Sequence, residues 1–151
     1  MSLSDSFPDH LKREFAQRNI KIGSVIRIHV KDTNPPKIKR FILVGQSFDK
    51  LIFATIFINT DINPNVFRTQ ELIDLNLELP AKQRPYLEHD SFADCSSIYN
   101  RNADWLLEMI GDDSQNVLGE VSDADLLLIR NKIKSARTIA PSVKKTFGMF
   151  F

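Results

Sequence analysis

Two long apolar runs in the first half of the sequence constrain the fold more than any other feature. They read KRFILVG over residues 39–45 and LIFATIFIN over residues 51–59, and the intervening QSFDK contains turn-forming residues. β-Branched and aromatic residues at this density favour strands, and a connection of this length suits a hairpin. The two runs are therefore predicted to pair as antiparallel strands.

Shorter segments supply further candidate strands. In KIGSVIRIHVKD, residues 21–32, apolar side chains interleave with polar ones, including His29 and Lys31, in the period-2 pattern of a half-buried strand. YLEHDSFADCSSIY, residues 86–99, and NVLGEVS, residues 116–122, are also predicted to be extended. TQELIDLNLELP fits both a helix and a strand, and NADWLLEMIGDD fits a short helix or a strand end.

Two segments carry the signals of helices. Residues 7–19 combine a proline near the first turn with Leu11 and Phe15, which lie four residues apart. Residues 123–135 follow Ser122, a good N-cap, and have acidic residues in the first turn and basic residues in the last turns. The second helix has more than one apolar face, so we expect it to dock against the rest of the protein.

Several short strands, hairpin-length connections and few glycines are typical of a small, strongly curved antiparallel sheet. The predicted fold is mainly β with some α, in one domain over residues 1–151. It consists of a small antiparallel β-barrel over residues 22–134, with an N-terminal helix and a docked C-terminal helix. Residues 136–151 form a basic and apolar tail, predicted either to be mobile or to make contacts.

The composition bounds the cellular setting and the chemistry. Net charge is +1, but two basic ends flank an acidic middle, which can produce either a basic face or internal salt bridges. A single cysteine, Cys95, leaves no internal disulfide, and no apolar run reaches the roughly 18 residues of a membrane span. With three histidines and no second cysteine, the usual zinc-ligand spacing is missing. We therefore expect a cytoplasmic protein without a membrane segment, metal or cofactor.

Three cations, Lys37, Lys39 and Arg40, stand at the entrance of the first apolar run. They can be the solvated end of a strand, whose charge prevents edge-to-edge aggregation, or they can bind an anion. Asn59 and Thr60, at the end of the second run, are turn formers by default. The pair His89-Asp90 resembles an acid–base couple, but neighbours in an extended segment point to opposite faces, so direct coupling is not expected.

The order of several segments resembles the PemK/MazF-like family of SH3-like barrels. These segments are GSVIRIHV, KRFILVG, the strand ending FINT, DSFADCSSIY and VLGEVSDADLLLIRNKI, which together span residues 22–134. The resemblance departs in two places, because DTNPPKIK replaces a glutamate-containing loop and Phe41 follows the strand arginine where the family has proline. It implies an SH3-like barrel that acts as a toxin, cleaves single-stranded RNA without a metal, forms a homodimer and is restrained by an antitoxin protein.

The resemblance also implies a set of site residues. Arg40 matches the arginine at the strand entrance and Thr60 matches the threonine after the next strand, while His29 and Asp94 are the candidates for proton transfer. The candidate RNA contacts are Lys31, Lys37, Lys39 and Asn59. Phe48, Phe53, Phe57 and Phe67 include candidate base-stacking residues. The alternative is a catalytically inactive barrel that binds RNA or a protein partner in a regulatory or defence system.

Apolar residues in the last third of the chain predict self-association. Trp105–Ile110 is predicted to lie in the core or in a dimer interface, and together with the helix over residues 123–135 and the tail residues 147–151 it is expected to form an exposed apolar patch. A few buried Phe or Leu side chains, each worth about 1.5–3 kcal/mol, can offset the entropy of association. We therefore expect a homodimer.

Overall fold

The computed structural model describes residues 20–30, 37–112 and 114–149, with only the backbone at residues 29, 30, 37, 111, 112 and 114. The helix predicted over residues 7–19 and the candidate RNA contact Lys31 lie outside the described residues. Within them, every helix falls short of the length and apolar character that a membrane span requires.

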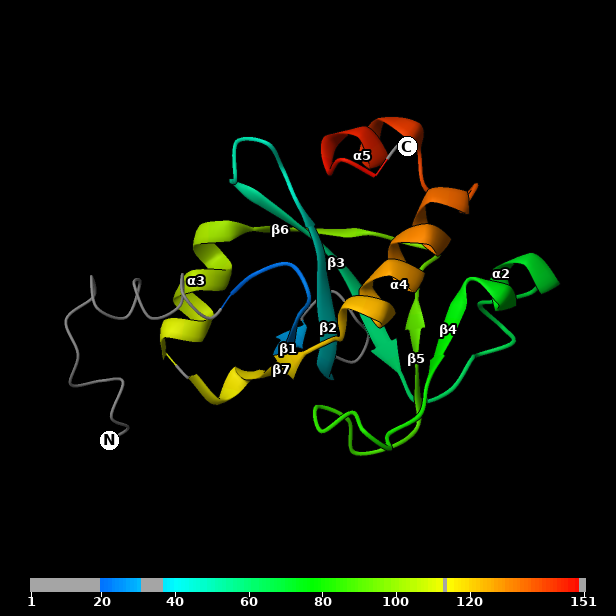
Figure 1. The fold of residues 1–151 in the computed structure, drawn as a ribbon, viewed down its shortest axis with the longest axis horizontal. Helices are drawn as coiled ribbons and strands as arrows, with labels where there is room; N and C mark the ends of the chain where they lie inside the picture. The colour runs from blue at the N-terminus through cyan, green and yellow to red at the C-terminus, as the bar shows by residue number, and fades with distance from the viewer. Residues whose placement is uncertain (1–19, 31–36, 113, 150–151) are drawn as a thin grey trace.

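Seven antiparallel strands form one curled sheet, a half-barrel (Figure 1). The strands are β1 (Ser24–Val30), β2 (Lys37–Gln46), β3 (Ile52–Asn59), β4 (Asn76–Leu79), β5 (Ser91–Asp94), β6 (Tyr99–Asn102) and β7 (Val117–Glu120). Their order is β4-β5-β3-β2-β1-β7, and β6 pairs with β3. The predicted hairpin is confirmed, because β2 and β3 pair antiparallel with Phe41 opposite Phe57.

The curl of the sheet has two local sources. The register shifts between Leu43 and Gly45 on β2, and again between Val25 and Ile26 on β1. Such irregularities bend a strand and increase its twist. On the side away from β2, β3 pairs with β6 over its first half and with β5 at its end. The short segment between β5 and β6 therefore runs past the middle of β3.

The helices are α2 (Gln70–Asp74), α3 (Ala103–Asp112), α4 (Asp123–Ser135) and α5 (Pro141–Thr146), with a 3-10 turn over Ser114–Asn116. The segment TQELIDLNLELP, residues 69–80, whose pattern fits both a helix and a strand, contains one of each: α2 followed by β4. The helix predicted over residues 123–135 is present with the predicted cap, since Ser122 Oγ accepts a hydrogen bond of 3.1 Å from the backbone N–H of Asp125. Its Ile129 and Ile133 are buried.

Two apolar cores lie on the two faces of the central hairpin. Alternate side chains of β2 and β3 join α4 on one face, where Ile42, Ile56 and Ile129 belong to one core. The intervening side chains join α3 on the other face, where Phe41 packs near Leu106. Because both faces are covered, residues 41–44 are all buried, which explains why this run is apolar without alternation.

From α4 to residue 149, the described part of the chain does not form an exposed apolar tail. Phe147 and Met149, which follow α5, are buried at 4% and 0% exposure and belong to the core on the α4 side. The expectation that Phe147 and Met149 contribute to an exposed patch is therefore wrong. Of the predicted Trp105–Ile110 patch, Leu106 and Ile110 are fully buried, whereas Trp105 is 37% exposed.

Candidate functional site

A pocket of about 530 Å³ lies where the end of β3 meets the start of β2, next to β5 and the loop of residues 80–90. Its volume falls within the range of ligand sites. Seven of the residues predicted from the sequence line it: the candidate catalytic and RNA-contacting residues Lys39, Arg40, Asn59, Thr60 and Asp94, and the candidate stacking residues Phe57 and Phe67. Residues far apart in the sequence, from β2, β3 and β5, therefore meet in one concave place.

Lys39 and Asn59 form one side of the pocket. Arg40 of β2 pairs with Ile58 of β3, and the same antiparallel register brings Lys39 opposite Asn59 at the next position. Lys39 Nζ donates a hydrogen bond of 2.5 Å to Asn59 Oδ1 and lies 5.4 Å from the centre of the Phe57 ring. The amide and the ring thus fix the position of the cation.

Arg40 points to the opposite face of β2, because successive side chains of a strand alternate. Its Nη2 lies 3.1 Å from Glu88 Oε1, and the Glu88 side chain is 69% exposed. Arg40 Nε is buried and has no hydrogen-bond partner. The guanidinium therefore holds a surface carboxylate through Nη2, at a position where an incoming anion can replace it, while its Nε is enclosed by the protein.

Asp94 ends β5 inside the pocket wall. Its Oδ1 accepts hydrogen bonds from the backbone N–H of Ser96 at 2.9 Å and from Ser96 Oγ at 2.5 Å. These bonds fix the carboxylate at the rim of the core, where the residue is 8% exposed. The neighbouring Cys95 is fully buried in the core on the α4 side, as a small core residue should be, and burial raises the pKa of its thiol to about 12.

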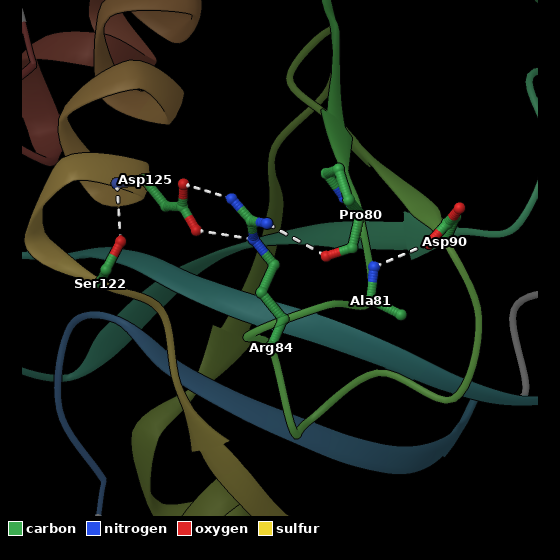
Figure 2. Close-up of polar contacts among 6 residues, drawn as sticks. All are labelled: Pro80, Ala81, Arg84, Asp90, Ser122 and Asp125. Atoms are coloured by element: carbon green, nitrogen blue, oxygen red, sulfur yellow. Dashed lines mark hydrogen bonds and ion pairs between the residues drawn. The ribbon is translucent and has the colours of Figure 1, made fainter.

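An ion pair anchors the 80–90 loop to α4 (Figure 2). Arg84 donates from Nε and Nη2 to the two oxygens of Asp125, each at 3.0 Å, and from Nη1 to the carbonyl of Pro80 at 3.0 Å. These contacts to Asp125 raise the pKa of Arg84. Asp90 closes the loop by accepting a 2.8 Å bond from the N–H of Ala81. The loop is thereby held in the position where Glu88 and His89 line the pocket.

His89 and Asp90 have separate roles, in line with the expectation that they are not a couple. His89 lines the pocket, whereas Asp90 binds the backbone of its own loop. Sequence reasoning gave no role to Glu88 and did not place His89 near Arg40. The only local signal was that both residues precede a short strand, which does not indicate which side of the sheet the loop covers.

Three predicted site residues have no described side chain. The register sets His29 opposite Ile38 and Lys37 opposite Val30, so both positions lie on paired strands close to the pocket-lining Ile38. Lys31 lies outside the described residues. Their predicted roles stay predictions.

The charges of the pocket are mixed. Lys39 and Arg40 are its cations, and Asp61, Glu88 and Asp94 are its carboxylates. Over the described ranges, no group of three or more His, Cys, Asp or Glu side chains is arranged to hold a metal ion. The arrangement offers an arginine fork, hydroxyl and amide groups, and an imidazole around one space.

No protein-family model and no curated protein matches the sequence. The resemblance to the PemK/MazF-like family therefore rests on the residues of the chain alone, and the family assignment remains a prediction.

Proposed function

We propose that this protein is a PemK/MazF-like endoribonuclease that cleaves single-stranded RNA without a metal ion. The observation that carries the proposal is the convergence of Arg40, Thr60 and Asp94 on one pocket. The three residues come from separate parts of the chain, and the sequence alone predicts each of them as a site residue. The proposal includes an SH3-like barrel topology and an antitoxin protein that restrains the enzyme.

The proposed reaction is an internal transesterification. A base removes the proton of the ribose 2′-OH, the resulting oxyanion attacks the adjacent phosphorus, and the bond from phosphorus to the 5′-oxygen breaks as an acid protonates that oxygen. The products are a 2′,3′-cyclic phosphate and a 5′-hydroxyl end. No oxidant, reductant or other co-reactant is needed.

Each pocket residue has a role in this scheme. Arg40 binds the phosphate oxygens and stabilises the charge that develops on them, because its fork of donors matches two oxygens at once. Thr60 donates a hydrogen bond to the same group. Asp94 and His29 were the sequence candidates for proton transfer, and His89 joins them because its imidazole lines the same pocket. Binding of a phosphate displaces Glu88 from Arg40.

The test is cleavage of mixed single-stranded RNA in the presence of a chelator. We expect fragments with cyclic phosphate ends from the wild-type protein, and a loss of about 100-fold or more in rate in Arg40→Ala, the typical cost of removing a group that stabilises transition-state charge. Arg137→Ala is the matched control, because Arg137 pairs with Glu71 at 2.7 Å and does not line the pocket. Intact RNA over a broad range of sequence and pH would reject the proposal.

A second candidate is a non-catalytic barrel that binds RNA or a protein partner in a regulatory or defence system. Its supporting observation is the occupation of Arg40 by Glu88 in a pocket where carboxylates outnumber cations. This candidate predicts association that weakens with salt, because phosphate contacts release counterions, and no turnover of the RNA. Cleavage that depends on Arg40 would reject it.

A further inference from the structure

A connected row of cations and aromatic rings leads away from the pocket along one face of the sheet. We call it the stacking surface, and it consists of Lys39, Phe57, Tyr99, Arg101 and Trp105. Lys39 lies 5.4 Å from the Phe57 ring centre, and the Phe57 and Tyr99 ring centres are 4.5 Å apart. Further along, the Arg101 guanidinium lies 5.9 Å from the Trp105 ring.

The two halves of the row are joined through Phe41. Its ring centre is 6.4 Å from that of Phe57, and the Arg101 guanidinium lies 5.7 Å from it. The row is thus continuous from the pocket residue Lys39 to the first turn of α3. Lys39, Phe57 and Tyr99 also line the pocket, so the stacking surface begins inside it.

Strand pairing places these side chains on the same face. On β6, Tyr99 pairs with Thr55 and Arg101 pairs with Phe53, and both partners alternate with the residues of the α4-side core. β6 runs directly into α3 (Figure 1), and the Asn102 side chain accepts a 3.1 Å hydrogen bond from the N–H of Trp105. The turn that presents the indole is therefore capped, which fixes its position relative to the sheet.

The aromatic side chains of the row differ in exposure: two are partly exposed and two are buried. Tyr99 and Trp105 are each 37% exposed, whereas Phe57, whose ring packs against Tyr99, is 9% exposed and Phe41 is 0% exposed. Large aromatic rings that are partly exposed and backed by packed rings are stacking platforms for unpaired bases, since every base has a planar face. The half-buried cations Lys39 and Arg101 alternate with these platforms, as phosphates alternate with bases in a nucleic acid strand.

We infer that the stacking surface binds a single-stranded nucleic acid, with bases on Tyr99 and Trp105 and backbone phosphates near Lys39 and Arg101. This inference rests on the proposed function, because the strand that crosses the stacking surface is the one whose scissile phosphate enters the pocket. The exposed carboxylates Asp104 and Glu108 flank Trp105 on α3 and disfavour a phosphate there. At Trp105 on α3, the stacking surface is therefore expected to contact bases and not phosphates.

Trp105 is the only tryptophan of the chain, so its emission reports directly on this surface. The probe is an oligomer of about ten 2′-O-methyluridines, a length within the site sizes of single-strand binders. Its methylated 2′-oxygen cannot act as a nucleophile, which separates binding from cleavage. We expect quenching of Trp105 emission with the same midpoint as the anisotropy of an end-labelled oligomer.

Variants measured by anisotropy complete the test. Tyr99→Ala and Trp105→Ala should each weaken binding about tenfold or more, the typical effect of removing one stacked aromatic. Arg101→Ala should weaken binding and reduce the salt slope by about one. Arg137→Ala is the control, because Arg137 is an exposed cation that pairs with Glu71 of α2 and does not belong to the stacking surface, so its loss should leave binding unchanged.

The outcomes separate the two proposals. Oligomer binding that leaves Trp105 emission unchanged overturns the stacking surface but not the pocket. Absence of any binding by the wild-type protein overturns the stacking surface, and the RNA cleavage assay then decides the pocket separately. Tyr99→Phe keeps the ring and should retain binding, so a loss in Tyr99→Ala that Tyr99→Phe shares would show damage to the fold near β6 and would count against stacking by the Tyr99 ring.

Discussion

The partly buried ion pair between Arg84 and Asp125 fixes the position of the 80–90 loop, which forms one wall of the pocket. The side chains of Arg84 and Asp125 are 23% and 10% exposed, so the carboxylate is nearly removed from water. Two parallel hydrogen bonds and the additional Pro80 carbonyl satisfy the guanidinium. Removal of either partner leaves a charge without compensation in a place that water hardly reaches.

Arg84→Met is expected to lower the free energy of unfolding by about 3–5 kcal/mol, because Asp125 then stays buried without its partner. Urea unfolding of the wild-type protein and the variant measures the change. Arg137→Met provides the comparison: Arg137 and Glu71 form an exposed pair, with side chains 83% and 47% exposed, and such pairs contribute about 1 kcal/mol or less. Equal losses in both variants would contradict the role of burial.

The buried thiol of Cys95 is expected to make the free energy of unfolding fall as the pH rises above 9. Burial, with a smaller effect of Asp94, raises the pKa of its thiol from 9.0 to about 12, so the unfolded chain releases a proton that the folded protein keeps. The contribution to stability is therefore complete below pH 9 and is lost as the pH rises towards 12. The loss has a limiting slope of about 1.4 kcal/mol per pH unit.

The measurement compares the slopes of unfolding free energy against pH above pH 9 in the wild-type protein and in Cys95→Ala. The slope should be shallower in the variant. Tyr86, whose pKa is also raised by burial, is present in both proteins and cancels in the comparison. Identical slopes would mean that the thiol is not buried in solution.

Elements that are specified by their own residues were predictable, and those placed by distant partners were not. The β2–β3 hairpin follows from two apolar runs and a short connection, and α4 follows from Ser122 and the charges at its two ends. The segment over residues 69–80 was ambiguous because its apolar pattern fits two periods, and it contains a short helix and a short strand.

The candidate site divides in the same way. Arg40 and Thr60 lie at the ends of predicted strands, so the pairing of those strands brings them together. Glu88 and His89 lie in a loop whose position depends on an ion pair between residues 41 positions apart. No short sequence pattern indicates a contact between residues so far apart in the chain. The buried position of Phe147 likewise depends on a tight fit against β2 that sequence does not reveal.

That fit supplies a prediction at the scale of elements. A Cβ added at Gly45 would lie 3.0 Å from Phe147 Cβ and 3.1 Å from Met149 Cε, closer than packed atoms normally approach. Gly45→Ala should therefore displace the segment after α5 and destabilise the protein by about 1–3 kcal/mol, the usual cost of overpacking.

Thermal unfolding and limited proteolysis measure this effect. We expect a lower melting temperature and faster cleavage near residues 147–149 in Gly45→Ala. Gly148→Ala serves as a contrast, because a Cβ there meets no atom within 4 Å, although its φ of +68° adds backbone strain. Unchanged melting in Gly45→Ala would show that the segment after α5 adjusts without cost.

At the scale of the whole molecule, the two cores bury many of the large apolar side chains of the described residues, but not all of them. Since Phe147 and Met149 are buried, these two residues of the tail do not supply the surface on which self-association was expected. α4 still presents Leu127 and Leu128 at 61% and 49% exposure. We predict a homodimer that pairs this face of α4 and leaves the stacking surface uncovered.

Sedimentation equilibrium at micromolar concentration tests the predicted dimer. The wild-type protein should sediment as twice the chain mass of 17.3 kDa, and Leu127→Lys with Leu128→Lys should sediment as the monomer, since charges in a two-fold interface repel their own copies. Lys substitutions at Val66 and Ile38, which are 61% and 68% exposed near the pocket, should not change the mass. A wild-type monomer would reject the dimer.

The bond between Arg84 and Asp125 also sets a time order for biosynthesis. Chains emerge from the ribosome at roughly 5–20 residues per second, and a domain generally folds as a unit. The hairpin of β2 and β3 is complete by residue 59, but the loop that carries Glu88 and His89 has no anchor until residue 125 has emerged. The pocket wall therefore forms only after α4 has emerged, and a truncation ahead of α4 would remove both the anchor of this loop and the α4 side of the core.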